Sequence, residues 1–212
     1  MKRQDRRDRL AAARLYLCTG IRDAAEDLAK FLDAVLGAGV DIVQMREKTA
    51  SLDAKREAAR VFRRLTDEHA ALFIVNDDPD LATSCDADGV HLGQEDTAPE
   101  AARRLLGEDL LIGRSTHSPD ELVRALDEPA DYLGVGPVHA TPTKPGREGV
   151  GLSYVRFAAQ NATVPFFVTG GMDAATIPLA LEAGATRVVV VRALTEAPDP
   201  AGAAKELRAL LD

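Results

Sequence analysis

Short runs rich in Val, Ile, Leu and Phe recur about every 25 residues, and stretches of Ala, Leu, Glu and Arg with helical period separate them. The apolar runs begin near Leu15, Val40, Leu72, Gly89, Leu111, Asp131, Pro165 and Arg187. The clearest helical segments are residues 22–37 and 53–70, which have apolar faces opposite charged ones, and residues 200–211 end the series. This pattern predicts eight strands that alternate with helices.

Alternating strands and helices favour a parallel sheet that helices cover. Eight such units in 212 residues favour a single (β/α)8 barrel, the TIM-barrel class of α/β fold, over an open doubly wound sheet. No linker or change of composition divides the chain, so we expect one domain over residues 1–212. Residues 1–12 carry charges of alternating sign, and we expect them to form a solvated N-terminal lead-in to the first strand.

The composition disfavours several classes of partner. A formal net charge of -8 makes the surface as a whole repel nucleic acid and anionic lipid. No apolar run approaches the roughly 20 residues that span a bilayer, and no apolar stretch follows the charged amino terminus. Cys18 and Cys85 lack the spacing of zinc or redox sites, and we expect both to be reduced packing residues. We therefore expect a cytoplasmic protein with no nucleic-acid or membrane partner, and leave a homo-oligomer open.

The second expected strand, in DIVQMREK, carries polar side chains on one face. Period two places on this face Ile42, Gln44, Arg46 and Lys48. Val43 and Met45 face the other way and would pack outward on helices. An amide and two cations turned inward cost desolvation energy unless an anion or carboxylates meet them. A diphosphate suits the pair, because Arg grips two phosphate oxygens while Lys acts as a point charge; internal ion pairing is the alternative.

Two carboxylates follow neighbouring strand ends, Asp77 in FIVND and Asp96 in GVHLGQED. Magnesium takes one or two carboxylates together with substrate phosphates, so the pair predicts a Mg²⁺ site with Asn76 beside it for substrate. Each aspartate alone also suits a helix N-cap or a turn. We expect Asp78 to cap the following short helix, and Asp88 to be a turn residue before the fourth strand.

Other polar residues follow the later strands. The segment GRSTHS offers Ser115 for a ligand hydrogen bond, while His117 is left open between a structural and a functional role. His91 within GVHLG is expected to be a packed barrel residue. The role of His139 is not assigned.

The connection HATPTKPGREGVG, residues 139–151, is long and irregular, which is typical of a functional loop or lid. Within it, Thr141, Thr143 and Lys144 are candidates to surround a phosphate or diphosphate. TGG after the seventh strand and VVVVRA at the eighth match the usual phosphate-binding corner of such barrels. Together with the second strand, these segments predict two anion sites at one mouth.

The motifs QMREK, ND, ADGVHLGQED, GRSTH, GP followed by TPTK, and TGG appear in this order. In these motifs the chain resembles the thiamine-phosphate synthase family, from LYLCTG to its end. The resemblance implies a transferase that joins hydroxymethylpyrimidine diphosphate to hydroxyethylthiazole phosphate, giving thiamine phosphate and diphosphate. Its partners would be these two phosphorylated small molecules, and its cofactor one Mg²⁺ per active site.

Position by position, the resemblance also implies site residues. The pyrimidine diphosphate would be held by Gln44, Met45, Arg46, Glu47, Lys48, Asn76, Ser115 and Lys144. The thiazole phosphate would be held by Thr141, Pro142, Thr143, Gly171, Val191 and Arg192. The metal ligands would be Asp77 and Asp96, and the catalytic residues Arg46, Lys48, Lys144 and Ser115. The implied mechanism is dissociative, with diphosphate leaving before the thiazole nitrogen attacks, and it requires no protein nucleophile.

The expected thiazole half departs from the family pattern. His139 and Ala140 stand where the family usually has Tyr-Pro, and Arg192 replaces a common serine. The Gly-x-Gly-Gly turn is reduced to Val168, Thr169, Gly170 and Gly171. A thiazole tautomerase on the same barrel and a non-catalytic barrel that binds thiamine phosphates are the alternatives. The intact QMREK and the aspartate pair disfavour the tautomerase, which handles no diphosphate.

Overall fold

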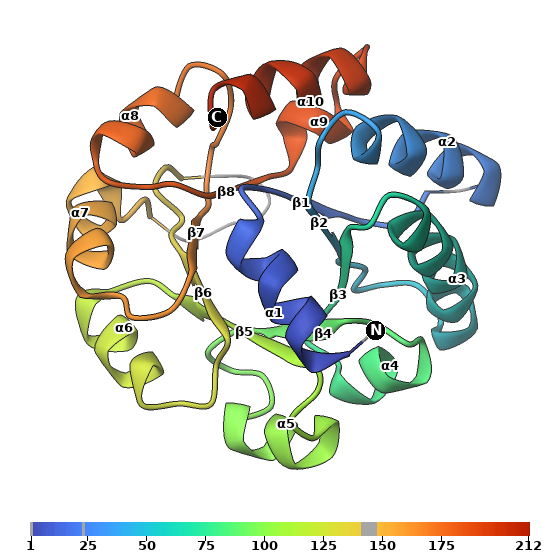
Figure 1. Cartoon of the computed structure of the whole chain (residues 1–212), viewed down its shortest axis with the longest axis horizontal. Coiled ribbons are helices and arrows are strands. Elements are labelled where there is room, and N and C mark those ends of the chain that lie inside the picture. The colour runs from blue at the N-terminus through green and yellow to red at the C-terminus, as the bar shows by residue number, and fades with distance from the viewer. Residues whose placement is uncertain (1, 23, 141–147) are drawn as a thin grey trace.

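Eight parallel strands form a closed barrel in chain order, and β8 pairs with β1 to complete it (Figure 1). The computed structural model describes residues 2–22, 24–140 and 148–212. The strands are β1 (Leu15–Thr19), β2 (Ile42–Met45), β3 (Leu72–Asn76), β4 (Gly89–Leu92), β5 (Leu111–Thr116), β6 (Tyr132–Val135), β7 (Phe166–Val168) and β8 (Val188–Val190). The predicted (β/α)8 barrel is confirmed.

Helices that follow the strands surround the barrel, and α1, which precedes β1, lies across one end of it (Figure 1). They are α1 (Arg3–Ala12), α2 (Ala25–Leu36), α3 (Leu52–Glu68), α4 (Pro79–Ser84), α5 (Pro99–Leu106), α6 (Pro119–Leu126), α7 (Gly151–Asn161), α8 (Ile177–Glu182), α9 (Arg192–Thr195) and α10 (Pro200–Ala209). Among the described residues, no helix is both long enough and apolar enough to cross a membrane.

All eight expected strands are present, and some of them begin one or two residues later than the sequence predicted. The second begins at Ile42 rather than Val40, because the Val40 N–H donates to the carbonyl of Val35 and so belongs to the turn after α2. Strand alternation divides the core into two layers. Leu15 and Leu17 pack outward with the helices, whereas Tyr16 between them faces the lumen. The lumen cluster consists of Leu10, Ala13, Tyr16, Ile42, Leu72, Ile74, Leu111, Tyr132 and Phe167.

The N-terminal segment forms a helix, a feature that the expected solvated lead-in did not include. Helix α1 lies across one end of the barrel (Figure 1), and its Leu10 is 3% exposed within the lumen cluster. Arg6 Nε donates to Asp88 Oδ1 at 3.0 Å. Arg7 Nη2 donates to Asp131 Oδ1 at 2.5 Å. Most of the segment is exposed, as a solvated lead-in would be, but its helical form, its buried Leu10 and the contacts of Arg6 and Arg7 with carboxylates at the strand starts were not expected.

Asp88 is not merely the turn residue expected before β4. It is fully buried, and its Oδ2 accepts hydrogen bonds from the Phe73 N–H at 2.9 Å and from Arg63 Nη1 at 3.0 Å. Together with the Arg6 contact, these bonds compensate the buried charge. Asp88 therefore joins α1 and α3 to the barrel.

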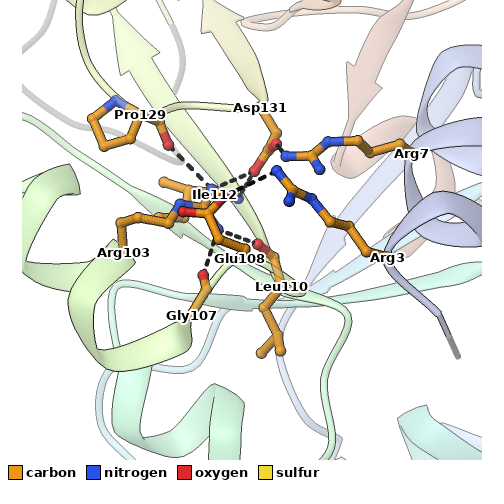
Figure 2. Close-up of polar contacts among 9 residues, drawn as sticks. All are labelled: Arg3, Arg7, Arg103, Gly107, Glu108, Leu110, Ile112, Pro129 and Asp131. Carbon is orange, nitrogen blue, oxygen red and sulfur yellow. Dashed lines mark hydrogen bonds and ion pairs between the residues drawn. The ribbon is translucent and has the colours of Figure 1, made fainter.

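Asp131 has the same role before β6. Figure 2 shows Arg7 and Arg103 converging on its carboxylate, with Arg103 Nη2 at 2.6 Å from Oδ2, an atom that also accepts from the Ile112 N–H at 2.9 Å. Arg103 donates further to backbone carbonyls, including that of Leu110 at 2.7 Å. Two carboxylates thus hold α1 against the amino-terminal ends of the strands.

Candidate active site

A cavity of about 470 Å³ opens at the carboxyl ends of the strands, the face that carries the active site in barrels of this kind. Ten of the predicted site residues line it: Gln44, Arg46, Lys48, Asn76, Asp77, Asp96, Ser115, Gly171, Val191 and Arg192. They come from both expected halves of the mouth. The structure therefore brings the two predicted anion sites into one cavity.

Strand β2 presents its polar face as predicted. Gln44, Arg46 and Lys48 line the cavity, while Met45 is 2% exposed and packs with the outer core. Glu47 accepts hydrogen bonds from the Thr49 N–H and hydroxyl, both at 2.9 Å, and the backbone bond from Thr49 is the main cause of a lowered Glu47 pKa. The Met45 and Glu47 side chains therefore support the strand and its turn, and neither lines the cavity.

Asp77 and Asp96 lie together at one side of the cavity. Burial raises the pKa of Asp77, and the hydrogen bond and negative charge of Asp96 raise it further, while Lys48 opposes the shift. Lys48 Nζ lies 3.3 Å from Asp77 Oδ2. Two converging carboxylates repel one another, and a single lysine compensates only part of their charge. A further cation bound between them would therefore stabilise both in the ionised form. Asp77 also has a φ of 66°, a left-handed conformation that aspartate tolerates better than most residues.

This donor set fits Mg²⁺. In the described part of the chain, no group of three or more His, Cys, Asp and Glu side chains is arranged to hold a metal ion. Two carboxylates are nevertheless what Mg²⁺ takes from a protein when substrate phosphates and water complete its coordination. Asp77 and Asp96 would hold it. Asp78, in contrast, caps α4 as predicted, with Oδ1 accepting from the Leu81 N–H at 2.9 Å.

The loop that carries Asp96 is held by residues of β5. Asp96 Oδ2 accepts a hydrogen bond from the Gly93 N–H at 2.7 Å, and a Cβ at Gly93 would lie only 2.9 Å from that oxygen. Arg114, which is 7% exposed, donates to the Gly93 carbonyl, and Gln94 Nε2 donates to the Ser115 carbonyl at 2.6 Å. Arg114 was missed by the sequence reasoning, although it lies within the GRSTH motif.

Several cavity residues were also missed at the level of the sequence, namely Tyr16, Cys18, Gln94, Tyr132 and Phe167. The period-two argument used for β2 would have identified Tyr16 and Cys18 in LYLCT, which occupy the lumen face of β1. His91 packs against Tyr132 as expected of a barrel residue, and it lines the cavity as well. His117 also lines it, and its Nδ1 contacts the Gly136 carbonyl.

The sequence profile of the thiamine monophosphate synthase family matches residues 15–194. The thiamine-phosphate synthase of Acidothermus cellulolyticus is 52% identical over 206 residues, covering 95% of this chain and 96% of that protein. That of Streptomyces avermitilis is 51% identical over 202 residues, covering 94% of each. The chain belongs to the thiamine-phosphate synthase family. A solved structure, thiamine phosphate pyrophosphorylase from Pyrococcus furiosus, superposes with a TM-score of 0.85 at 32% identity, covering 97% of this chain and 96% of that one.

Within this member of the thiamine-phosphate synthase family, the phosphate corner is partly described. Gly170 and Gly171 have φ values of 98° and 71°, and the His139 N–H donates to the Gly170 carbonyl at 3.2 Å. A Cβ at Gly171 would lie 3.1 Å from the His139 Cβ, so His139 covers this turn closely. The predicted ligand contacts Thr141, Pro142, Thr143 and Lys144 lie outside the described residues.

Proposed function

We propose that this protein joins hydroxymethylpyrimidine diphosphate to hydroxyethylthiazole phosphate, forming thiamine phosphate and releasing diphosphate with the help of Mg²⁺. Membership of the thiamine-phosphate synthase family supports this activity. The observation that carries the proposal is the pair Asp77 and Asp96 beside Lys48 and Arg46 in one cavity. A barrel of 212 residues would act as a single domain with two phosphorylated small-molecule substrates.

The pyrimidine half of the cavity would bind the diphosphate. Arg46 and Lys48 would supply positive charge for its oxygens, since arginine can bind two oxygens at once and lysine acts as a point charge. The family resemblance implies the same role for Lys144, which lies outside the described residues. Mg²⁺, held by Asp77 and Asp96, would neutralise negative charge on the diphosphate and favour its departure.

The reaction would be a dissociative displacement. The bond between the pyrimidine methylene carbon and the diphosphate oxygen breaks, and its electron pair leaves with the diphosphate. The thiazole nitrogen then donates its lone pair to the methylene carbon. The enzyme's residues bind and orient: Gln44, Asn76 and Ser115 hold the pyrimidine, while the corner at Gly171 and Arg192 holds the thiazole phosphate. Preorganised cations in the cavity would supply most of the acceleration.

The test is a coupled assay for released diphosphate, run with both substrates and with or without EDTA. We expect Mg²⁺-dependent diphosphate release together with thiamine phosphate. Asp77→Ala should lower turnover on the order of a thousandfold, because the departing charge loses a preorganised partner. The matched control is Asp80→Ala, which removes an exposed aspartate three residues away on α4.

Other outcomes would contradict the proposal. Aromatised thiazole phosphate without thiamine phosphate would indicate a tautomerase. Tight binding of thiamine phosphates without diphosphate release would indicate a binding protein. Turnover by Asp77→Ala that equals that of Asp80→Ala would exclude the metal assignment.

A further inference from the structure

A continuous series of side-chain hydrogen bonds crosses the barrel lumen beneath the cavity, from Gln44 on β2 to Ser115 on β5. Gln44 Nε2 donates to the Tyr16 hydroxyl at 2.7 Å, and the Tyr16 and Tyr132 hydroxyls lie 3.0 Å apart. His91 Nδ1 lies 3.2 Å from the Tyr132 hydroxyl, and His91 Nε2 lies 2.9 Å from Ser115 Oγ. We call these five residues the lumen network. Its two ends are residues assigned to the pyrimidine.

The backbone is shaped to hold the middle of this network. A Cβ at Gly113 would lie 2.2 Å from Tyr132 Cζ and 2.4 Å from His91 Nδ1, so any other residue would displace both rings. A Cβ at Gly134 would lie 3.1 Å from His91 Cε1. Two glycines on adjacent strands therefore make the space that the His91 ring occupies.

Aromatic packing fixes the two tyrosines from the other side. The Phe167 ring meets both at an interplanar angle of 81°, with centroids 5.4 Å from Tyr16 and 5.6 Å from Tyr132. Tyr16 is 1% exposed and Tyr132 is fully buried. Burial raises the pKa of both phenols well above the ordinary tyrosine value, so each keeps its proton and has one hydrogen to donate.

Counting these hydrogens gives the network a direction. Cys18 Sγ donates to Gln44 Oε1 at 3.2 Å, which leaves the Gln44 amide nitrogen facing Tyr16. Because Tyr16 accepts from Gln44, its own proton points to Tyr132. The Tyr132 proton then points to His91 Nδ1, so a neutral His91 carries its hydrogen on Nε2 and donates it to Ser115.

We propose that Tyr16, Tyr132 and His91 are positioning residues: the two tyrosines hold His91 in its Nε2–H form, and His91 donates to Ser115 Oγ, which directs the Ser115 hydroxyl hydrogen toward the bound substrate. Ser115 then selects a ring with an acceptor atom, such as an unprotonated ring nitrogen, at the point it faces. A C–H or N–H group at that point would leave the Ser115 hydroxyl hydrogen without an acceptor. The kinetic part of this inference rests on the proposed function.

The first test needs no enzymatic activity and observes the unsubstituted protein, with one variant used only to assign the signal. The protein contains only four histidines, so ¹⁵N-histidine labelling gives few signals, and the His91 signal is assigned by its loss in His91→Gln. At about pH 8, above the ordinary histidine pKa, two-bond ¹H–¹⁵N spectra distinguish the two neutral forms. We expect His91 to be protonated at Nε2 alone. Protonation at Nδ1, or a mixture of both forms, would overturn the proposal.

The second test is kinetic and has a matched control. Tyr132→Phe removes one hydroxyl from the lumen network, whereas Tyr154→Phe removes another buried tyrosine hydroxyl, one that donates to Thr116 Oγ1 at 2.7 Å behind the barrel wall. We expect Tyr132→Phe to lower kcat/KM for the pyrimidine substrate about tenfold, the effect of about one hydrogen bond, with KM for the thiazole phosphate unchanged. Tyr154→Phe should change neither.

Equal kinetics of the two phenylalanine variants would overturn the positioning role, as would equal weakening of both substrates by Tyr132→Phe. Failure of the wild-type protein to make thiamine phosphate would instead contradict the proposed function. In that case the His91 spectrum still decides whether the network has the stated direction.

Discussion

At the amino-terminal end of the barrel, Asp88 is fully buried and the Asp131 side chain is 7% exposed, and each carboxylate is met by two arginines and a backbone N–H. At the carboxyl-terminal end, Asp77 and Asp96 lie against one another with one ion-pairing lysine, Lys48, 3.3 Å from Asp77. Pairs of aspartates thus lie at both ends of the barrel, but in opposite electrostatic environments. At the amino-terminal end, arginines of the protein compensate the negative charge of the aspartates. At the carboxyl-terminal end, part of the negative charge is left for a bound ligand to compensate.

This difference separates stability from function within a single fold. Compensated ion pairs at the amino-terminal end attach α1 and stabilise the barrel floor. Repelling carboxylates at the mouth lower the stability of the metal-free protein, and that cost accompanies a site built for a cation and a diphosphate. The following predictions test the division, from the largest effect on folding to the smallest.

Removal of Asp88 should have the largest effect on folding. Asp88→Ala leaves Arg6 and Arg63 without their buried partner, and we expect the free energy of unfolding to fall by about 3–5 kcal/mol. Urea denaturation measures this change. Asp67→Ala is the control, because Asp67 pairs with the same Arg63 at 2.6 Å but is 65% exposed, and its loss should cost less than about 1 kcal/mol. Equal losses in the two variants would contradict the account.

Truncation of Leu10 tests how much hydrophobic packing contributes to the attachment of α1 to the barrel. Leu10→Ala leaves a gap where α1 packs in the lumen cluster, and we expect a loss of about 2–3 kcal/mol in the free energy of unfolding. Leu105→Ala on α5 is the control, since Leu105 is 51% exposed and its truncation should change stability by at most about 0.5 kcal/mol. A Leu10→Ala variant as stable as the control would mean that α1 does not stabilise the barrel.

The smallest effect concerns pH. The raised pKa of Asp77 means that its favourable contribution to folding is present at acid pH and is lost as pH rises through the shifted value. In EDTA, Asp77→Asn should therefore gain stability relative to the parent as pH rises above the ordinary aspartate pKa, by less than about 1 kcal/mol. Excess Mg²⁺ is the control, because a bound cation favours the ionised carboxylate and should remove the gain. A relative loss with rising pH would contradict the pKa direction.

Much of the fold was predictable because strand periodicity is a strong local signal. The cavity residues on β2 were also predictable from the sequence. Period two places Gln44 and Met45 on opposite faces of the strand whatever the tertiary context, and only Gln44 lines the cavity. Helix α1 was missed because its sequence is dominated by charge, and only Leu10 is buried within it. Its stability comes from carboxylates distant in sequence, which no local pattern reveals.

The aspartates show where sequence reasoning had an unused clue. Asp88 precedes its strand and Asp77 follows one, so the barrel topology places them at opposite ends. That order alone distinguishes a stabilising position from a site position. The lumen network could not be predicted in the same way, because the meeting of Tyr16 with Tyr132 depends on their depth in the closed barrel.

The aspartates at the amino-terminal end of the barrel contribute to folding stability, and those at the carboxyl-terminal end contribute to turnover. Urea denaturation and diphosphate release measured side by side on Asp77→Ala and Asp88→Ala test this division most directly. We predict that Asp88→Ala loses about 3–5 kcal/mol of folding free energy but keeps its turnover per folded molecule. Asp77→Ala should lose no folding free energy but lose turnover on the order of a thousandfold. A folded Asp77→Ala protein that turns over at the parent rate would contradict the account.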